Sequence, residues 1–188
     1  MGKETFEHLL GFHGAPTLVG VKPATLLSFH KKSYEDFDAL LASYAPCFRC
    51  KGISVRRVVE DETHVLLLFY RARRLSRLLK RPAAKALLAE LGYDAEARLS
   101  ALLAELVRRM EAGGGFPHEI GLFLGYPPGD VRGFIENHGK NFAFVGYWKV
   151  YGSEAEAREL FAVYAECTQE FCEQLDAGAR FEDLVVAG

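Results

Sequence analysis

Residues 53–70 read ISVRRVVEDETHVLLLFY and predict a β-hairpin. Two runs rich in apolar and β-branched residues, 53–59 and 63–70, flank the acidic turn Glu60-Asp61-Glu62, which is the pattern of two antiparallel strands joined by a short turn. The second run is apolar on both faces from Val65 to Phe69. Because the central strand of a sheet is covered on both sides, we expect the second strand to be the central one.

Upstream of the hairpin, the sequence predicts one strand and one helix. Residues 25–29 have the composition of a short buried strand. The helix is expected to begin at Ser33, with Asp36 completing an approximate capping box, and to be ended by Pro46 and the segment of residues 47–50. Its apolar face follows helical spacing and consists of Phe37, Leu40, Leu41 and Tyr44. Residues 1–23 mix apolar and turn residues and give no clear prediction.

Downstream of the hairpin, the sequence predicts a series of helices. Pro82 suits the first turn of one helix, and Asp94 is expected to cap the next. That next helix has apolar residues at helical spacing over 99–110 and is expected to stop at the glycine triplet 113–115. The remaining predicted elements are helices over 118–124 and 127–139, an aromatic strand over 142–151, and a long helix after the capping box of Ser153 and Glu156.

The order of these elements favours an α+β fold. Strands and helices do not alternate regularly, which argues against a doubly wound parallel sheet. We expect a single mixed or antiparallel sheet of about four strands with helices packed on it. The length of 188 residues and a hydrophobic content of 49% suit a single domain over residues 1–188.

Charge and composition narrow the function classes. The 23 Lys and Arg residues against 25 Asp and Glu residues give a net charge of −2, which argues against a general nucleic-acid binder. No stretch is apolar over the roughly 18 residues of a membrane span. The N-terminal residues carry charges and lack the pattern of a secretory signal. We therefore expect a cytoplasmic protein with reduced thiols and no membrane partner.

The most informative stretch for chemistry is FPHEIGLFLGYP, residues 116–127. It places His118 and Glu119 at the first turn of a short helix, where the helix dipole favours an anion. A neutral imidazole at a helix start can act as a general acid or base, with Glu119 as its orienting or electrostatic partner. The structural alternative is that Glu119 is a first-turn capping charge and that His118 bonds a backbone carbonyl.

Tyr126 of the same stretch and two further segments rich in glycine or proline supply candidate ligand contacts. The further segments contain Lys22 and the pair Lys140 and Asn141 in the loop HGKN, residues 138–141. We expect these residues and His118 to line one pocket, since pockets form where polar residues converge beside apolar structure. The alternative for the loop is a glycine helix cap with a solvated lysine. Lys149, inside the aromatic strand, is an additional candidate, although most such strands belong to the core.

Three motifs together resemble an uncharacterised bacterial family, a domain of unknown function common in anaerobes. They are PHEIGLFLGYP over 117–127, GYWKVYG over 146–152, and APTLVGVKP over 15–23. The resemblance covers nearly the whole chain and implies no activity. Many relatives carry a cysteine directly before Ala-Pro-Thr, where this chain has Gly14. If that thiol acts as a nucleophile or ligand in the relatives, this chain lacks it.

The cysteines and one basic run leave further alternatives open. Cys47 and Cys50 form a CxxC pair, but it follows a predicted helix and precedes a strand, unlike thioredoxin-type motifs. Cys167 and Cys172 do not share a helix face, so reduced thiols are favoured over a metal site. The basic run over 71–81 could bind phosphate or nucleic acid, or be a solvated helix face; its cations are Arg71, Arg73, Arg74, Arg77, Lys80 and Arg81.

The sequence therefore predicts a protein that binds a small anionic or cofactor-like ligand. It contains no Walker loop, Rossmann glycine pattern or GxSxG elbow, so it specifies no cofactor. One alternative is an enzyme that uses His118 as its general acid or base. The other is a non-enzymatic interaction or self-association module, in which the basic segment 71–81 and the acidic C-terminal helix contact another protein or another copy.

Overall fold

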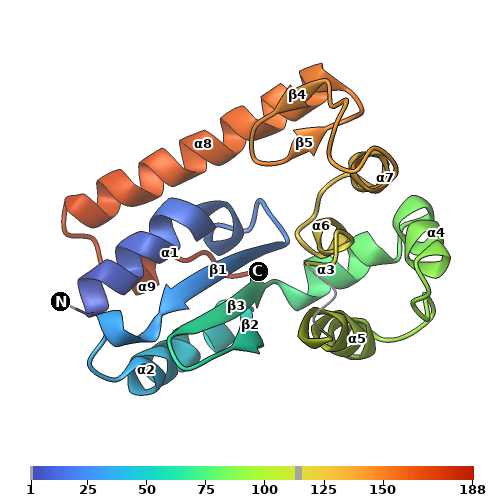
Figure 1. Ribbon diagram of the computed structural model, residues 1–188. Coiled ribbons are helices and arrows are strands. Elements are labelled where there is room, and N and C mark those ends of the chain that lie inside the picture. The colour runs from blue at the N-terminus through green and yellow to red at the C-terminus, as the bar shows by residue number, and fades with distance from the viewer. Residues whose placement is uncertain (1, 113–115) are drawn as a thin grey trace. The chain divides into compact units, whose positions relative to one another are not determined.

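A computed structural model describes residues 2–112 and 116–188. By its contacts the chain divides into two compact units (Figure 1). Unit 1 comprises Met1–Ala72 and Tyr164–Gly188, and unit 2 comprises Arg73–Val163. That residues 1–188 form a single domain stays a prediction.

Unit 1 contains a three-stranded antiparallel sheet. Its strands are β1 (Ala24–His30), β2 (Ser54–Glu60) and β3 (His64–Tyr70), in the order β1-β3-β2 (Figure 1). The predicted hairpin is confirmed, and β3 is central as its apolar sequence indicates. Leu67 of β3 pairs with Leu27 of β1 on one side and with Arg57 of β2 on the other.

Helix α1 (Lys3–Leu18) covers residues whose secondary structure was not predicted from their sequence. It contacts β1 and β3, and its small residues allow close approach. A Cβ atom at Gly11 would lie 3.0 Å from Phe171, and one at Gly14 would lie 3.4 Å from Thr25 of β1. Glycine and Pro16 disfavour a helix locally, so packing against neighbouring elements stabilises it. Gly14 is buried.

Helix α2 (Phe37–Cys50) starts later and ends later than predicted. Residues Lys31–Ser33 form a 3-10 turn, η1, and Asp36 is the N-cap, accepting a hydrogen bond from the backbone N–H of Ala39 at 2.9 Å. The prediction that Pro46 and the segment after it end the helix, with the CxxC pair beyond it, is wrong, since the helix continues through Pro46 to Cys50. The CxxC pair therefore lies in the last turn of a helix.

Arg71 is buried in unit 1 and links segments of the chain by hydrogen bonds, so it does not belong to a solvated basic face. Its guanidinium donates to the carbonyl oxygens of Thr17 at 2.7 Å, Leu18 at 2.6 Å and Val186 at 2.7 Å. The first two carbonyls belong to the C-terminal end of α1, where the helix dipole favours a cation. Arg71 thus joins α1 to the segment that follows the short helix α9 (Phe181–Leu184).

Unit 2 consists mainly of helices. They are α3 (Ala72–Leu79), α4 (Pro82–Glu90), α5 (Leu99–Glu111), α6 (Ile120–Phe123) and α7 (Pro128–Glu136). The prediction that Asp94 caps α5 is wrong: the N-cap is Arg98, and Asp94 instead accepts a hydrogen bond from the N–H of Glu96. The glycine triplet predicted to end α5 lies outside the described residues.

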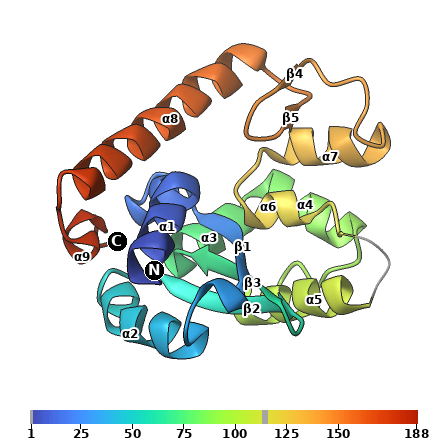
Figure 2. The ribbon, with the colours of Figure 1, turned by 60° about the vertical axis from the view of Figure 1, so that its left-hand side comes forward.

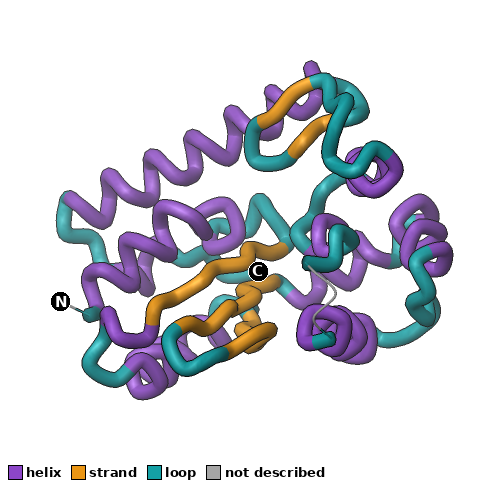
Figure 3. The backbone as a smooth tube through the Cα atoms, viewed as in Figure 1, coloured by secondary structure: helices purple, strands orange, loops and turns teal. Residues whose placement is uncertain are grey.

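The strand predicted over 142–151 is instead a tight hairpin of β4 (Phe144–Val145) and β5 (Lys149–Val150), separate from the three-stranded sheet (Figure 3). The chain turns at Gly146, where a Cβ atom would lie 2.3 Å from the Phe161 ring. Figure 2 shows the hairpin beside α7. The fold is α+β as predicted, with its strands divided between a three-stranded sheet and this hairpin.

The long helix α8 (Glu154–Asp176) begins at the predicted capping box, where the N–H of Glu156 donates to the Ser153 hydroxyl at 3.3 Å. Residues 154–163 of this helix belong to unit 2 and residues 164–176 to unit 1. Among the described helices, none is long and apolar enough to cross a membrane.

Candidate functional site

Unit 2 contains a cavity of about 390 Å³ between α6, α7 and the β4–β5 hairpin. Its walls are mainly aromatic and aliphatic, with a few polar groups, as is typical of small-molecule sites. The lining residues are Phe116, His118, Ile120, Gly121, Tyr126, Asp130, Val131, Phe134, Val145, Gly146, Tyr147, Trp148 and Lys149. Two residues predicted from the sequence, His118 and Tyr126, are among them.

Trp148 forms the buried wall of this cavity. Its indole stacks on the ring of Tyr126 with centroids 4.6 Å apart, and it meets Phe161 edge-on at 4.5 Å. Aromatic pairs in these arrangements are favourable beyond the area they bury. The burial of Tyr126 also raises the pKa of its phenol. Neighbouring rings therefore hold the indole in one position.

Asp130 anchors this wall to α7. Its Oδ2 atom accepts the indole N–H of Trp148 at 2.7 Å. Its Oδ1 atom accepts the backbone N–H groups of Tyr151 at 2.8 Å and Gly152 at 2.7 Å. A buried carboxylate needs such donors, so Asp130 is a structural anchor. Asp130 is not among the candidate site residues that the sequence predicts.

His118 lies at the exposed side of the cavity. Its ring meets Phe134 edge-on, with centroids 4.9 Å apart. Among the described residues, its ring nitrogens have no hydrogen-bond partner. The expected structural alternative, a bond from His118 to a backbone carbonyl, is therefore absent from the part of the chain that the structure describes. An unbonded imidazole beside a cavity can accept or donate one hydrogen bond to a ligand.

Glu119 was predicted from the sequence to be the partner of His118, but it bonds other side chains. The side chain is buried, and its Oε1 atom accepts the Tyr93 hydroxyl and the Arg109 guanidinium, each at 3.1 Å. Arg109 also packs over the Tyr93 ring, 3.9 Å from its centroid. Burial, together with the Glu119 charge, raises the pKa of Tyr93. Glu119 does not line the cavity, and its position is that of a structural charge.

The loop of residues 138–141 ends helix α7. His138, Gly139 and Asn141 have φ angles of 51°, 70° and 57°, the left-handed conformation found after helix ends. The N–H groups of Gly139 and Lys140 donate to carbonyls of residues 134 and 137 at 2.9 Å. These two backbone donors are therefore used inside the chain and are not free for an anion.

Side chains of the hairpin fasten this loop. Lys149 donates to the carbonyl of Gly139 at 2.8 Å, and the Tyr151 hydroxyl donates to that of Lys140 at 2.8 Å. The side chain of Asn141 bonds Asn137 at 3.4 Å. Lys140 and Asn141 are exposed and do not line the cavity, whereas Lys149 does.

Lys22 belongs to unit 1, so its part in a shared pocket stays a prediction. It is buried, and its ammonium lies 5.9 Å from the centroid of the Tyr164 ring. Burial lowers the pKa of Lys22 to about 8, because an ammonium loses hydration there.

The four cysteines are free thiols. Burial raises the pKa of Cys47, Cys167 and Cys172, which makes these three less nucleophilic. Within residues 2–112 and 116–188, no three His, Cys, Asp or Glu side chains are grouped to hold a metal ion.

The fold and the cavity define an α+β protein with an aromatic pocket in its second unit. The chain belongs to the family described as “Protein of unknown function (DUF3793)”, whose model matches residues 10–185. This finding confirms that the chain is a member of an uncharacterised family, as the motifs indicated. No curated protein and no solved structure matches the chain.

Proposed function

We propose that unit 2 binds a small molecule in the cavity beside Trp148. The observation that carries the proposal is an imidazole without a hydrogen-bond partner among the described residues, His118, at a cavity walled by aromatic rings. Apolar walls with a few polar groups supply affinity and orientation, respectively. His118 would give the ligand its orienting hydrogen bond, and Tyr126 would supply apolar contact.

The enzymatic alternative uses the same pocket. His118 is the group that would move a proton to or from a bound substrate, because a neutral imidazole has one nitrogen that donates a hydrogen bond and one that accepts. Glu119 would act only by positioning, since it bonds Tyr93 and Arg109. The remaining sequence-based contacts, Lys22, Lys140 and Asn141, stay predictions.

The proposal is tested by tryptophan fluorescence, since Trp148 is the only tryptophan of the chain. The full chain is titrated with a panel of nucleotides, flavins, quinones, aromatic acids and aliphatic acids, with thermal unfolding followed in parallel. A ligand of the native state gives a saturable fluorescence change and a higher melting temperature. His118→Ala should weaken that ligand about tenfold, by loss of one hydrogen bond.

The matched control is His138→Asn, which changes an exposed histidine of the same unit outside the cavity. Asparagine tolerates the left-handed conformation that position 138 adopts, so this variant should bind like the wild type. A panel in which no compound gives a saturable change overturns the proposal, as does equal binding by the His118→Ala variant.

A second candidate function is self-association through charged helices. The α3 region exposes Arg73, Arg77 and Lys80, which form no ion pair with a described residue, while α8 exposes Glu166 and Glu170 without one. Opposite charges on two copies would attract at low salt. Sedimentation velocity should then show dimers at low salt that the Arg73→Glu/Arg77→Glu variant loses; a salt-independent monomer contradicts this candidate.

A further inference from the structure

We infer that the cavity of unit 2 selects a planar aromatic ligand that carries an anionic group. This inference rests on the proposed function and specifies its ligand class. It follows from two independent features of the cavity: the aromatic rings that its wall leaves exposed, and the sign of the polar groups that remain available beside them.

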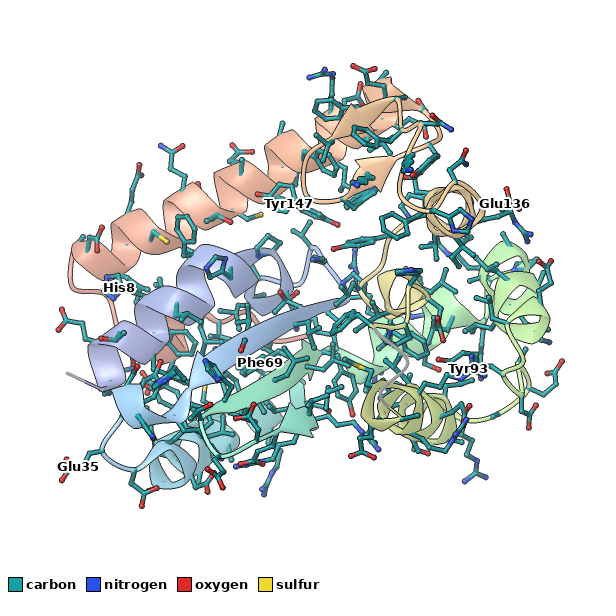
Figure 4. The ribbon with its side chains drawn as sticks, viewed as in Figure 1. His8, Glu35, Phe69, Tyr93, Glu136 and Tyr147 are labelled. Carbon is teal, nitrogen blue, oxygen red and sulfur yellow. The ribbon has the colours of Figure 1, made fainter. Side chains whose placement is uncertain are left out.

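The rings favour a planar apolar partner. Phe116 and Tyr147 line the cavity and are 52% and 44% exposed. Exposed apolar side chains gathered at a cavity are typical of a ligand-binding surface. Tyr147 projects from the turn between β4 and β5 (Figure 4). Deeper in the wall, Tyr126 and Trp148 already stack at an interplanar angle of 25°. A flat ring system entering the cavity would cover the exposed rings through the same stacked or edge-on contacts.

The polar groups favour an anion on that ring. The carboxylate of Asp130 already accepts three N–H groups and so is compensated. Lys149 is the lysine among the lining residues. Its ammonium donates one hydrogen bond to the Gly139 carbonyl, and an ammonium has three N–H donors. Its Nζ atom lies 5.1 Å from the Phe142 ring centroid and 5.7 Å from that of Phe134.

The available donors therefore exceed the available acceptors. Lys149 offers two ammonium protons, and His118 offers a ring N–H or, when protonated, two. An acceptor that is also negatively charged would form charge-assisted hydrogen bonds with Lys149, and these are stronger than neutral ones. A neutral ring of the same shape would gain the stacking alone.

A matched pair of fluorescent probes separates the contribution of ring stacking from the contribution of the anionic group. Anilinonaphthalene sulfonate and N-phenyl-naphthylamine share one ring system, and only the first carries an anion. Each is titrated into the full chain, followed by probe emission and by Trp148 fluorescence. We expect the sulfonate to bind about tenfold more tightly than the neutral probe, as a charge-assisted hydrogen bond requires.

Lys149→Met should reduce sulfonate affinity about tenfold and leave the neutral probe unchanged, since methionine keeps an apolar chain of similar length. The control is Lys85→Met on α4 of the same unit, outside the cavity, which should change neither. Near-ultraviolet circular dichroism of each variant shows that the probes report a native pocket, because the sulfonate also binds loosely packed states, which lose this signal.

The outcomes distinguish this inference from the proposed function. Equal affinity for the two probes, or a Lys149→Met variant that binds the sulfonate like the wild type, overturns the anionic specificity and leaves a ligand pocket standing. Failure of both probes while an aliphatic member of the panel binds overturns the aromatic class. If no compound perturbs Trp148, the proposed function and this inference fall together.

Discussion

The indole N–H of Trp148 donates to Oδ2 of Asp130 at 2.7 Å and fixes the β4–β5 hairpin to helix α7. Asp130→Ala would leave this donor and two backbone N–H groups without their acceptor. We expect a loss of about 3 kcal/mol, since one buried donor left unpaired costs about 1–3 kcal/mol and the two backbone donors are only partly buried. Urea unfolding followed by Trp148 fluorescence measures it. The exposed Asp94→Ala serves as the control and should change little; equal stability of the two variants contradicts the anchor role.

Two glycines one turn apart on α7 form a matched test of packing. A Cβ atom at Gly133 would lie 2.5 Å from the Tyr151 ring, whereas one at Gly129 would meet nothing within 4 Å. Gly133→Ala should destabilise by about 2 kcal/mol through overpacking. Gly129→Ala should stabilise by up to about 1 kcal/mol, because alanine restricts the unfolded chain. Thermal unfolding measures the stability of both variants. A Gly133→Ala variant more stable than Gly129→Ala would show that α7 packs differently.

Glu119 should behave as a structural charge. Glu119→Ala removes the acceptor of the Tyr93 hydroxyl and one of the two carboxylates that pair with Arg109, the other being that of Glu105. Because the Tyr93 hydroxyl is buried, we expect a loss of about 1–3 kcal/mol. Glu119→Gln keeps an acceptor and should cost less. Chemical denaturation measures both, and a ligand that perturbs Trp148 should bind Glu119→Gln within about twofold of wild type. If Glu119→Gln keeps full stability but loses ligand binding, that result would contradict the structural role and favour the alternative in which Glu119 acts together with His118.

Arg71 should hold the C-terminal segment of unit 1. Arg71→Met removes the guanidinium that donates to the carbonyls of Thr17, Leu18 and Val186, which should cost about 3 kcal/mol, as a hydrogen bond to a charged group contributes about 1.5–3 kcal/mol. The N–H of Val186, which donates to Leu18, should then exchange faster with deuterium. Arg73→Met, on the exposed face of α3, is the control. Unchanged exchange at Val186 in the Arg71 variant would contradict this role.

Lys22 should make the stability depend on alkaline pH. Its folded pKa is about 8, below the ordinary value of 10.5, so between these pH values the unfolded chain binds more protons than the folded chain. The free energy of unfolding therefore rises with pH across this window, by on the order of 3 kcal/mol from this group. Tyrosines and cysteines titrate there as well, so the difference from Lys22→Met isolates the effect. Parallel pH profiles for the two proteins would contradict it.

Local patterns predicted the elements whose residues favour one structure by themselves. The hairpin of β2 and β3 and the helical spacing within α5 are of this kind. Helix α1 was not predicted because Gly11, Gly14 and Pro16 disfavour helix locally, and its stability comes from packing. The strand over 142–151 was predicted as continuous because its aromatic and β-branched residues are typical of a strand throughout. The turn at Gly146 depends on a distant residue, since the ring of Phe161 leaves no room for a Cβ atom there.

The candidate site was predictable only in part for the same reason. His118 and Tyr126 belong to a motif with unusual glycine and proline content, and both line the cavity. Asp130 was missed because its partner Trp148 is 18 residues away, and no local pattern indicates that contact. Arg71 was grouped with its exposed basic neighbours, since charge alone does not reveal that a guanidinium is buried.

The indole N–H signal of Trp148 in a proton–nitrogen NMR spectrum tests the central claim most directly, because the chain has one tryptophan and therefore one such signal. On titration with a planar aromatic anion, we predict that this signal moves progressively to a saturated position, together with backbone signals of residues 145–149, and that His118→Ala weakens the titration. An indole signal that stays fixed while the same compound shifts signals elsewhere would contradict a ligand site in this cavity.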